Sequence, residues 1–154
     1  MATIEKIMTT KITTIPSGST LAEAHNIMRD KRIRHLPVVE SDGGVIGILS
    51  QRDINAVPDS KSIIVDWMMS TPVRYIASVS SIKQAVFKML ENKISCLLVV
   101  NEDDESVEGI VTTDDMLWYL VENIDENDKS EYTVKDLIVS ALGQASQNLS
   151  SAGI

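Results

Sequence analysis

The sequence of 154 residues contains one cysteine, Cys96, and only two histidines, His25 and His35. A single cysteine forms no disulfide within the chain, so nothing points to an oxidising compartment and we expect a cytoplasmic protein. One cysteine and two histidines far apart also lack the spacing of metal ligands. No metal site is therefore expected.

Long apolar runs are missing as well. Residues 1–10 are interrupted by Glu5 and Lys6, and no later run approaches the length that crosses a membrane. We expect neither a signal peptide nor a transmembrane helix, and hence no membrane partner. The composition, 44% hydrophobic and 23% charged, is typical of a globular protein.

Positive charge is scarce towards the end of the chain. Residues 101–154 carry 2 basic and 13 acidic side chains, whereas residues 1–100 carry 12 basic and 9 acidic ones. Because nucleic acids bind to extended basic faces, no nucleic-acid partner is expected. Basic residues gather only around Lys31, Arg32, Arg34 and His35, where they could serve a site or complement the end of a helix.

The sequence does contain an internal repeat. A shift of 61 residues gives 11 identities over the 37 positions from Ile4 to Glu40, Met8/Met69 and Ala24/Ala85 among them. After a one-residue insertion, a shift of 62 aligns Gly47 with Gly109. Because the matches run in order through helix, strand and turn patterns alike, we interpret the halves as a duplication.

Each half predicts the same series of elements. Capping boxes at Thr20-x-x-Glu23 and Ser81-x-x-Gln84 begin amphipathic helices. Apolar runs at 36–39, 45–49, 96–100 and 107–111 predict paired strands, and short first strands are expected at 12–15 and 73–76. Further helices, capped by Ser50 and Thr112, are predicted at 51–55 and 113–121.

These elements predict an α/β fold of the α+β kind, with a small three-stranded sheet and flanking helices in each half. A half of this size buries little apolar surface alone, so the sheets should pack face to face about a pseudo-twofold axis, with two clefts between them. The expected boundaries are 1–61 for the first repeat with its linker, 62–122 for the second, and 123–154 for an acidic connector, an amphipathic C-terminal helix and a mobile tail.

Two strings carry a family resemblance, IGILSQRDI at residues 46–54 and EGIVTTDDM at residues 108–116. Both match the Gly-h-h-Ser/Thr-x-x-Asp-h pattern, where h is apolar, of the CBS-domain family. Residues 7–9 (IMT), 68–72 (MMSTP) and 34–39 (RHLPVV) match further family patterns. Residues 1–122 therefore resemble a tandem CBS pair, or Bateman module.

The resemblance implies a regulatory module that senses an adenosyl ligand in the clefts between the repeats. AMP, ADP, ATP, S-adenosylmethionine and NAD are all compatible, and no cofactor is required. Such pairs are commonly homodimers, and a chain of this length is expected to stand alone. An unidentified client protein would then receive the signal.

The resemblance also implies a ribose site. In the family the signature aspartates, here Asp53 and Asp115, bind the ribose hydroxyls, and an ionised carboxylate accepts two hydrogen bonds from a vicinal diol. Ser50 and Thr112 contact ribose or phosphate, or only cap a helix. Asp53 and Asp115 equally support a cap, so both interpretations stay open.

Phosphate and adenine contacts are implied in the same way. In related modules basic residues at the positions of Arg34 and His35 reach a phosphate, and Arg52 could add to them. Their counterparts in the second half, Ser95, Cys96 and Asp114, carry no positive charge, so we expect one good phosphate site. The adenine is expected beside the segments that lead into the first strands, with Ile12, Val73, Thr10 and Pro72 as candidates.

No enzymatic activity is expected. Asp114 and Asp115 are the only carboxylate pair worth considering, and adjacent residues at a helix start point in different directions. The alternative function is a protein–protein interaction or dimerisation module with vestigial clefts, in which residues 101–131 and the C-terminal helix dock a partner.

Overall fold

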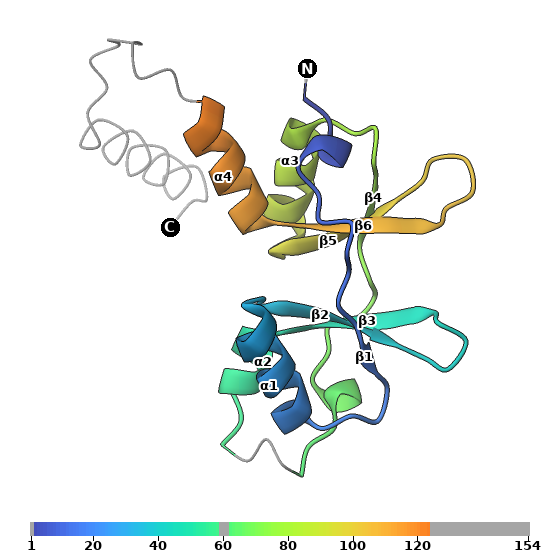
Figure 1. Ribbon diagram of the computed structural model, residues 1–154, viewed down its shortest axis with the longest axis vertical. Coiled ribbons are helices and arrows are strands. Elements are labelled where there is room, and N and C mark those ends of the chain that lie inside the picture. The colour runs from blue at the N-terminus through green and yellow to red at the C-terminus, as the bar shows by residue number, and fades with distance from the viewer. Residues whose placement is uncertain (1, 59–61, 124–154) are drawn as a thin grey trace, which may run out of the picture. The chain divides into compact units, whose positions relative to one another are not determined.

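The computed structural model describes residues 2–58 and 62–123 (Figure 1). Met1–Leu120 form one compact unit that contains both halves of the repeat. The C-terminal helix and the tail predicted beyond residue 123 lie outside the described residues. None of the helices in these ranges combines the length and the apolar composition of a membrane span.

Both halves have the predicted order of elements. The first contains a 3₁₀ turn η1 (Ile4–Lys6), β1 (Ile15–Pro16), α1 (Leu21–Lys31), β2 (His35–Val39), β3 (Val45–Ser50) and α2 (Gln51–Asn55). The second contains η2 (Val65–Trp67), β4 (Tyr75–Ala77), α3 (Ile82–Asn92), β5 (Cys96–Val100), β6 (Val107–Thr112) and α4 (Thr113–Asn123). The α/β fold with two three-stranded sheets is thereby confirmed.

The helices begin where the capping boxes predicted. At α1, the Glu23 backbone N–H donates to Thr20 Oγ1 over 3.2 Å, and the Thr20 N–H donates to Glu23 Oε2 over 2.7 Å. Ser81 and Gln84 form the same pair of bonds at the start of α3. These reciprocal bonds satisfy N–H groups that the first turn of a helix leaves without a partner.

The two sheets have the same topology. In each, the short first strand pairs in parallel with the second, which pairs antiparallel with the third. Because side chains alternate along a strand, Leu36 and Val38 of β2 enter the core of the first half while the buried Pro37 faces the other way. On β5, Leu98 is fully buried but belongs to neither core. The sheets therefore pack through these second faces, as predicted.

The opening segment of each half packs on the other half. Ile4 of η1 is buried in the core of the second half, and its N–H donates to the Ser80 carbonyl oxygen over 2.9 Å. Val65 of η2 is buried in the core of the first half and donates to the Ser19 carbonyl oxygen over 2.8 Å. Burial of such side chains contributes about 1.5–3 kcal/mol each. This exchange was not predicted from the repeat.

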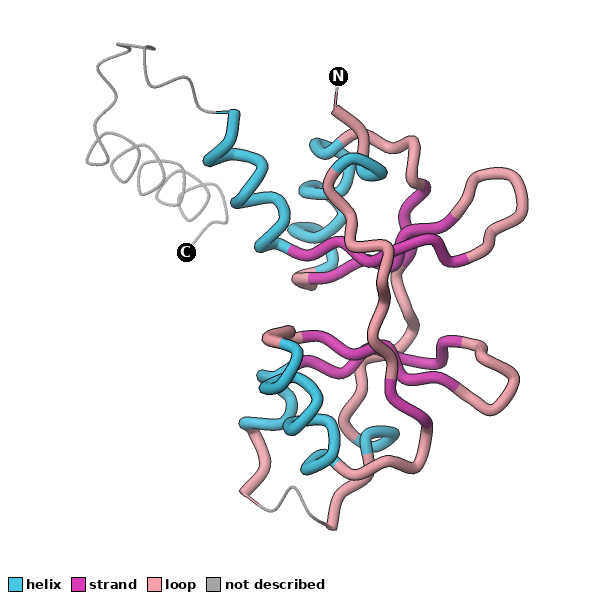
Figure 2. Tube along the Cα trace, in the orientation of Figure 1, coloured by secondary structure: helices cyan, strands magenta, loops and turns pink. Residues whose placement is uncertain are grey.

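The exchange explains why the first strands are shorter than predicted. Residues 9–14 and 70–74 cross between the halves, as the two connecting loops in Figure 2 show. At the start of the segments, Thr9 and Ser70 each form a single bridge to the third strand of the other half, with Ile110 and Ile48. Pairing with β2 begins only after the crossing, where Ile15 and Pro16 pair with Val38 and Val39. The crossing segments run beside the space between the two sheets, and this position makes them walls of the clefts.

Candidate ligand-binding clefts

The larger of two clefts has a volume of about 640 Å³ and is lined by both halves. The start of α2, the crossing segment 70–74 and residues 93–96 all contribute to its lining. The predicted site residues that line it are Ser50, Arg52, Asp53, Pro72 and Val73, together with Arg34 and His35.

Cys96 also contributes to the wall of the larger cleft. Burial raises the pKa of its thiol to about 12, so this side chain stays protonated and uncharged.

Asp53 holds the start of α2 and borders the larger cleft. Its Oδ2 accepts hydrogen bonds from the Ser50 N–H over 2.7 Å and from Ser50 Oγ over 2.6 Å. The capping hydrogen bonds expected between Asp53 and Ser50 are therefore present in the structure. Because both bonds end on Oδ2, the carboxylate is held in a fixed orientation at the edge of the cleft.

The smaller cleft has a volume of about 250 Å³ and repeats this arrangement at the start of α4. The Oδ2 atom of Asp115 accepts from the Thr112 N–H over 2.7 Å and from Thr112 Oγ1 over 2.9 Å. Ile12, from the crossing segment 9–14, lines the same cleft. The exchange thus brings Ile12 to Asp115 and Val73 to Asp53, so each cleft combines an aspartate with a crossing segment.

Thr10 is the one predicted site residue that lines neither cleft. Thr9 forms a backbone bridge with Ile110, and Thr9 itself lines the smaller cleft. Thr10 lies in a bend, where its carbonyl oxygen accepts from the Ile12 N–H over 3.2 Å, and its side chain is exposed. The roles of the other site residues stay predictions.

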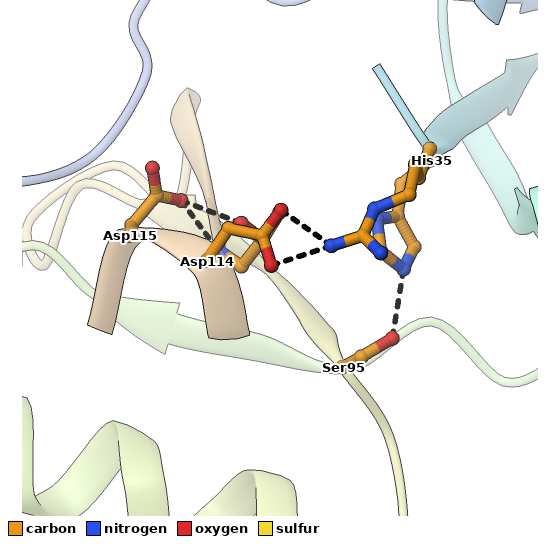
Figure 3. Close-up of polar contacts among 6 residues, drawn as sticks. His35, Ser95, Asp114 and Asp115 are labelled. Carbon is orange, nitrogen blue, oxygen red and sulfur yellow. Dashed lines mark hydrogen bonds and ion pairs between the residues drawn. The ribbon is translucent and has the colours of Figure 1, made fainter. Parts of the chain in front are cut away.

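Arg34 and His35 lie in the walls of both clefts. The Nη2 of Arg34 donates to both carboxylate oxygens of Asp114 on α4, and His35 Nε2 lies 2.8 Å from Ser95 Oγ (Figure 3). The sequence predicts Arg34 and His35 at one cleft only, because the repeat does not reveal that the two clefts share a wall.

His35 carries little positive charge at neutral pH. Burial, and next the nearby Arg34 guanidinium, lower the pKa of this imidazole below its usual value, against the opposing pull of Asp114 and Asp53. His35 therefore contributes a hydrogen-bonding ring and not a cation to either cleft. Arg34 is the charged member of the shared wall.

Further basic residues border the clefts without having been predicted. Arg74 and Lys93 line the larger cleft, and Lys11 and Arg32 line the smaller one. Lys93 and Arg32 are equivalent in the repeat, and both end a helix with a left-handed backbone, φ 53° and 55°. Their matching positions could have signalled a shared role, but only the fold places these helix ends at the clefts.

The two clefts differ in charge. The larger is bordered by four basic side chains and one carboxylate: Arg34, Arg52, Arg74, Lys93 and Asp53. The smaller is bordered by three basic side chains and two carboxylates: Lys11, Arg32, Arg34, Asp114 and Asp115. An anionic ligand is therefore better compensated in the larger cleft. Among the described residues, no group of three His, Cys, Asp or Glu side chains could hold a metal ion.

Comparison with known proteins identifies the repeat. Residues 4–58 and 63–122 each match the CBS domain family. The chain is 38% identical over 111 residues to homoserine O-acetyltransferase of Methanobrevibacter ruminantium, covering 72% of this chain and 22% of that protein. It is 27% identical over 113 residues to inosine-5′-monophosphate dehydrogenase of Methanocaldococcus jannaschii, covering 73% and 22%.

A solved structure has the same fold. The CBS domain pair of protein MJ0100, crystallised with 5′-methylthioadenosine and S-adenosyl-L-methionine, is 25% identical and superimposes with a TM-score of 0.72. The match covers 79% of this chain and 98% of that one. The chain thus spans nearly the whole of a CBS domain pair but only about a fifth of the length of the two relatives above.

Proposed function

Because the chain belongs to the CBS domain family, with one domain in each repeat, we propose that it binds a phosphorylated adenosyl ligand (AMP, ADP or ATP) in the larger cleft. CBS domain pairs are regulatory modules. The observation that carries the proposal is that the oriented Asp53 carboxylate and four basic side chains border one cleft. A ribose diol and a phosphate are the two chemical groups that this combination suits.

The placement of the ligand follows from the chemistry of the side chains that line the cleft. Asp53 accepts from the ribose hydroxyls, with Ser50 beside it. The adenine lies against the apolar Ile48, Pro72 and Val73, all of which line the cleft. The phosphate then extends toward the basic side chains, with Arg34 and Arg52 as its contacts and Arg74 and Lys93 as additional ones.

The smaller cleft takes an adenosyl compound with less negative charge, such as 5′-methylthioadenosine or S-adenosylmethionine. Its ribose contact is Asp115, and Ile12 is its apolar wall. The presence of two carboxylates, Asp114 and Asp115, disfavours an anionic ligand there and suits an uncharged or cationic one. The MJ0100 pair, crystallised with both of these compounds, supports this class of ligand.

The protein acts as a regulator and not as an enzyme in this proposal. The segment that resembles this chain accounts for about a fifth of two differently named proteins, an acetyltransferase and a dehydrogenase, as expected for a module that accompanies different activities. Ligand binding in the cytoplasm changes the module's conformation or assembly, and a client protein responds to that change.

Homodimerisation through the second half belongs to the same proposal. Phe87 and Leu90 on α3 are 55% and 68% exposed, and Leu117 and Leu120 on α4 are 59% and 53% exposed. In the described part of the first half, no large apolar side chain is exposed to this degree. Apolar side chains gathered on one half indicate an interaction surface.

Leu90→Glu should shift the sedimentation coefficient to that of a monomer, whereas Asn26→Glu on α1 should leave it unchanged.

The test of the ligand proposal is a panel of melting-temperature shifts with AMP, ADP, ATP, S-adenosylmethionine and 5′-methylthioadenosine. A ligand at 100 times its Kd raises the stability by about 2.7 kcal/mol. Asp53→Asn, which keeps an acceptor for the Ser50 N–H, should reduce the nucleotide shifts to those that binding in the smaller cleft produces. Asp115→Asn should abolish the 5′-methylthioadenosine shift. No shift with any compound at millimolar concentration would instead favour the interaction module with vestigial clefts.

A further inference from the structure

A single guanidinium serves two clefts. Arg34 and His35 are the residues common to both linings. In a perfectly symmetric pair each cleft would have its own arginine, but the repeat places Ser95 at the position equivalent to Arg34 and Cys96 at that of His35. The larger and smaller clefts therefore share the one Arg34 side chain.

The shared wall has a fixed part and a movable part. His35 is half-buried and held by Ser95. The side chains of Arg34 and Asp114 are 57% and 50% exposed, and an ion pair with this exposure is screened by water and weak. Arg34 can thus leave Asp114 at little cost when a better-placed anion is present.

We propose that Arg34 couples the two clefts, so that they compete for its guanidinium. A phosphate in the larger cleft draws Arg34 away from Asp114. The smaller cleft then disfavours a second phosphorylated ligand and favours a cationic adenosyl ligand. This inference rests on the function proposed above and adds a mode of regulation to it.

The direction of the coupling follows from the charges that remain. Once Arg34 points into the larger cleft, Asp114 and Asp115 stand on the smaller cleft with one positive neighbour fewer. A phosphate there meets carboxylates that are less compensated, while a sulfonium or ammonium group meets a more favourable field. Because coupling is reciprocal, a cationic ligand in the smaller cleft tightens nucleotide binding in the larger one to the same degree.

The decisive measurement is AMP titration by calorimetry, with the affinity of the smaller cleft determined in two ways. One value is the second binding step of the parent protein, where the larger cleft is already occupied. The other value is the affinity of the smaller cleft when no AMP is bound in the larger one. It is measured in Val73→Trp, where the tryptophan side chain fills the larger cleft, and again in Asp53→Asn as a check. We expect AMP to bind the smaller cleft about tenfold more weakly when the larger cleft is occupied.

Variants of the Arg34–Asp114 ion pair distinguish coupling through Arg34 from direct repulsion between the phosphates of two bound ligands. In Arg34→Ala the tenfold ratio should fall to about one, although both affinities weaken. Asp114→Asn should tighten AMP in the larger cleft, because Arg34 no longer has a competing partner. Arg29→Ala, at an exposed arginine of α1, is the matched control and should leave the ratio as in the parent protein.

S-adenosylmethionine gives a readout that does not need AMP in the smaller cleft. Saturating AMP should tighten its binding severalfold in the parent protein and not in Arg34→Ala. An AMP ratio near one together with no effect on S-adenosylmethionine would overturn the coupling while leaving the proposed function intact. A coupling that persists undiminished in Arg34→Ala would also overturn it. Absence of any binding of either compound would instead overturn the proposed function.

Discussion

Met69 of the second repeat lies directly over Gly47 of the first, so closely that a Cβ atom at position 47 would come within 2.4 Å of the Met69 sulfur. The equivalent Met8 lies over Gly109, where a Cβ atom would be 2.8 Å from the sulfur and 3.0 Å from the Thr9 carbonyl oxygen. The glycine of the family signature is thus required by the exchanged segment that packs on it.

Substitution of these glycines by alanine should destabilise the fold. We expect Gly47→Ala and Gly109→Ala to lower the free energy of unfolding by about 1–3 kcal/mol, because the added methyl group displaces a packed segment. Urea unfolding measures both values.

The matched control is Gly44→Ala in the exposed turn between β2 and β3, where the nearest atom, 3.1 Å from the added Cβ, belongs to the movable Asp42 side chain. Met69→Ala combined with Gly47→Ala should cost less than the sum of the two single changes, because the clash is removed. Additive costs would contradict the contact.

Arg74 and Lys93 should strengthen the binding of phosphorylated ligands. We expect Arg74→Ala and Lys93→Ala each to weaken AMP binding at least about tenfold, because losing one hydrogen bond to a charged group costs about 1.5–3 kcal/mol and about 1.4 kcal/mol is tenfold in affinity. Calorimetry with AMP and with 5′-methylthioadenosine provides the comparison. An equal loss for the uncharged compound would indicate a disturbed cleft and not a lost phosphate contact.

His35 should make stability depend on pH. Its pKa is lowered in the folded protein, mainly by burial, so at mildly acidic pH the unfolded chain binds more protons than the folded one. The free energy of unfolding should therefore decrease as the pH falls through about 6.5, the usual pKa of histidine. In His35→Gln this part of the decrease should be absent from urea titrations at pH 7.5 and pH 5.5. His25→Gln, at an exposed position of α1, is the matched control.

Asp66 should contribute stability that is lost in acid. Its carboxylate accepts from Ser17 Oγ over 2.5 Å and from the Gly18 N–H over 2.7 Å, and these bonds lower its pKa. The contribution is present above the unfolded pKa of about 3.9 and is lost as the pH falls through the folded pKa. Because the group lies near the surface, we expect Asp66→Asn to cost less than about 1 kcal/mol at pH 7.

The measurement for Asp66 is the difference in unfolding free energy between Asp66→Asn and the parent protein, followed from pH 7 to pH 3. The difference should shrink as the pH falls. Glu5→Gln provides the control, because Glu5 is the equivalent residue of the first repeat and its carboxylate accepts from the Oγ1 of the nearby Thr3, two residues away in the chain. A difference that does not change with pH would rule out the charge as its source.

Local signals predicted the elements well. The capping boxes at Thr20 and Ser81 determine the helix starts, and the apolar runs placed β2 and β5 to within a residue, because both signals depend on neighbours in the chain. The repeat also predicted that the sheets pack face to face. Capping boxes, apolar runs and the repeat alignment are all the same whether a segment packs on its own half or on the other.

The exchange could not be predicted for that reason. Met8 and Met69 are equivalent in the repeat, so an alignment is the same whether each packs on its own half or on the other. For the same reason the sequence did not predict Arg74 and Lys93 at the larger cleft. Their positions there depend on the crossing segment and on a helix end of the second half. The wall that the two clefts share at Arg34 was not predicted either.

The exchanged opening segments make the two halves one folding unit. Cleavage in the linker after residue 58 would leave each fragment with the opening segment that belongs in the other's core, so neither fragment alone contains its complete core. Contacts such as Ile4 with Ser80 join residues far apart in the chain and must close large loops before they stabilise anything. We expect slow refolding and a single unfolding transition in which the two repeats melt together.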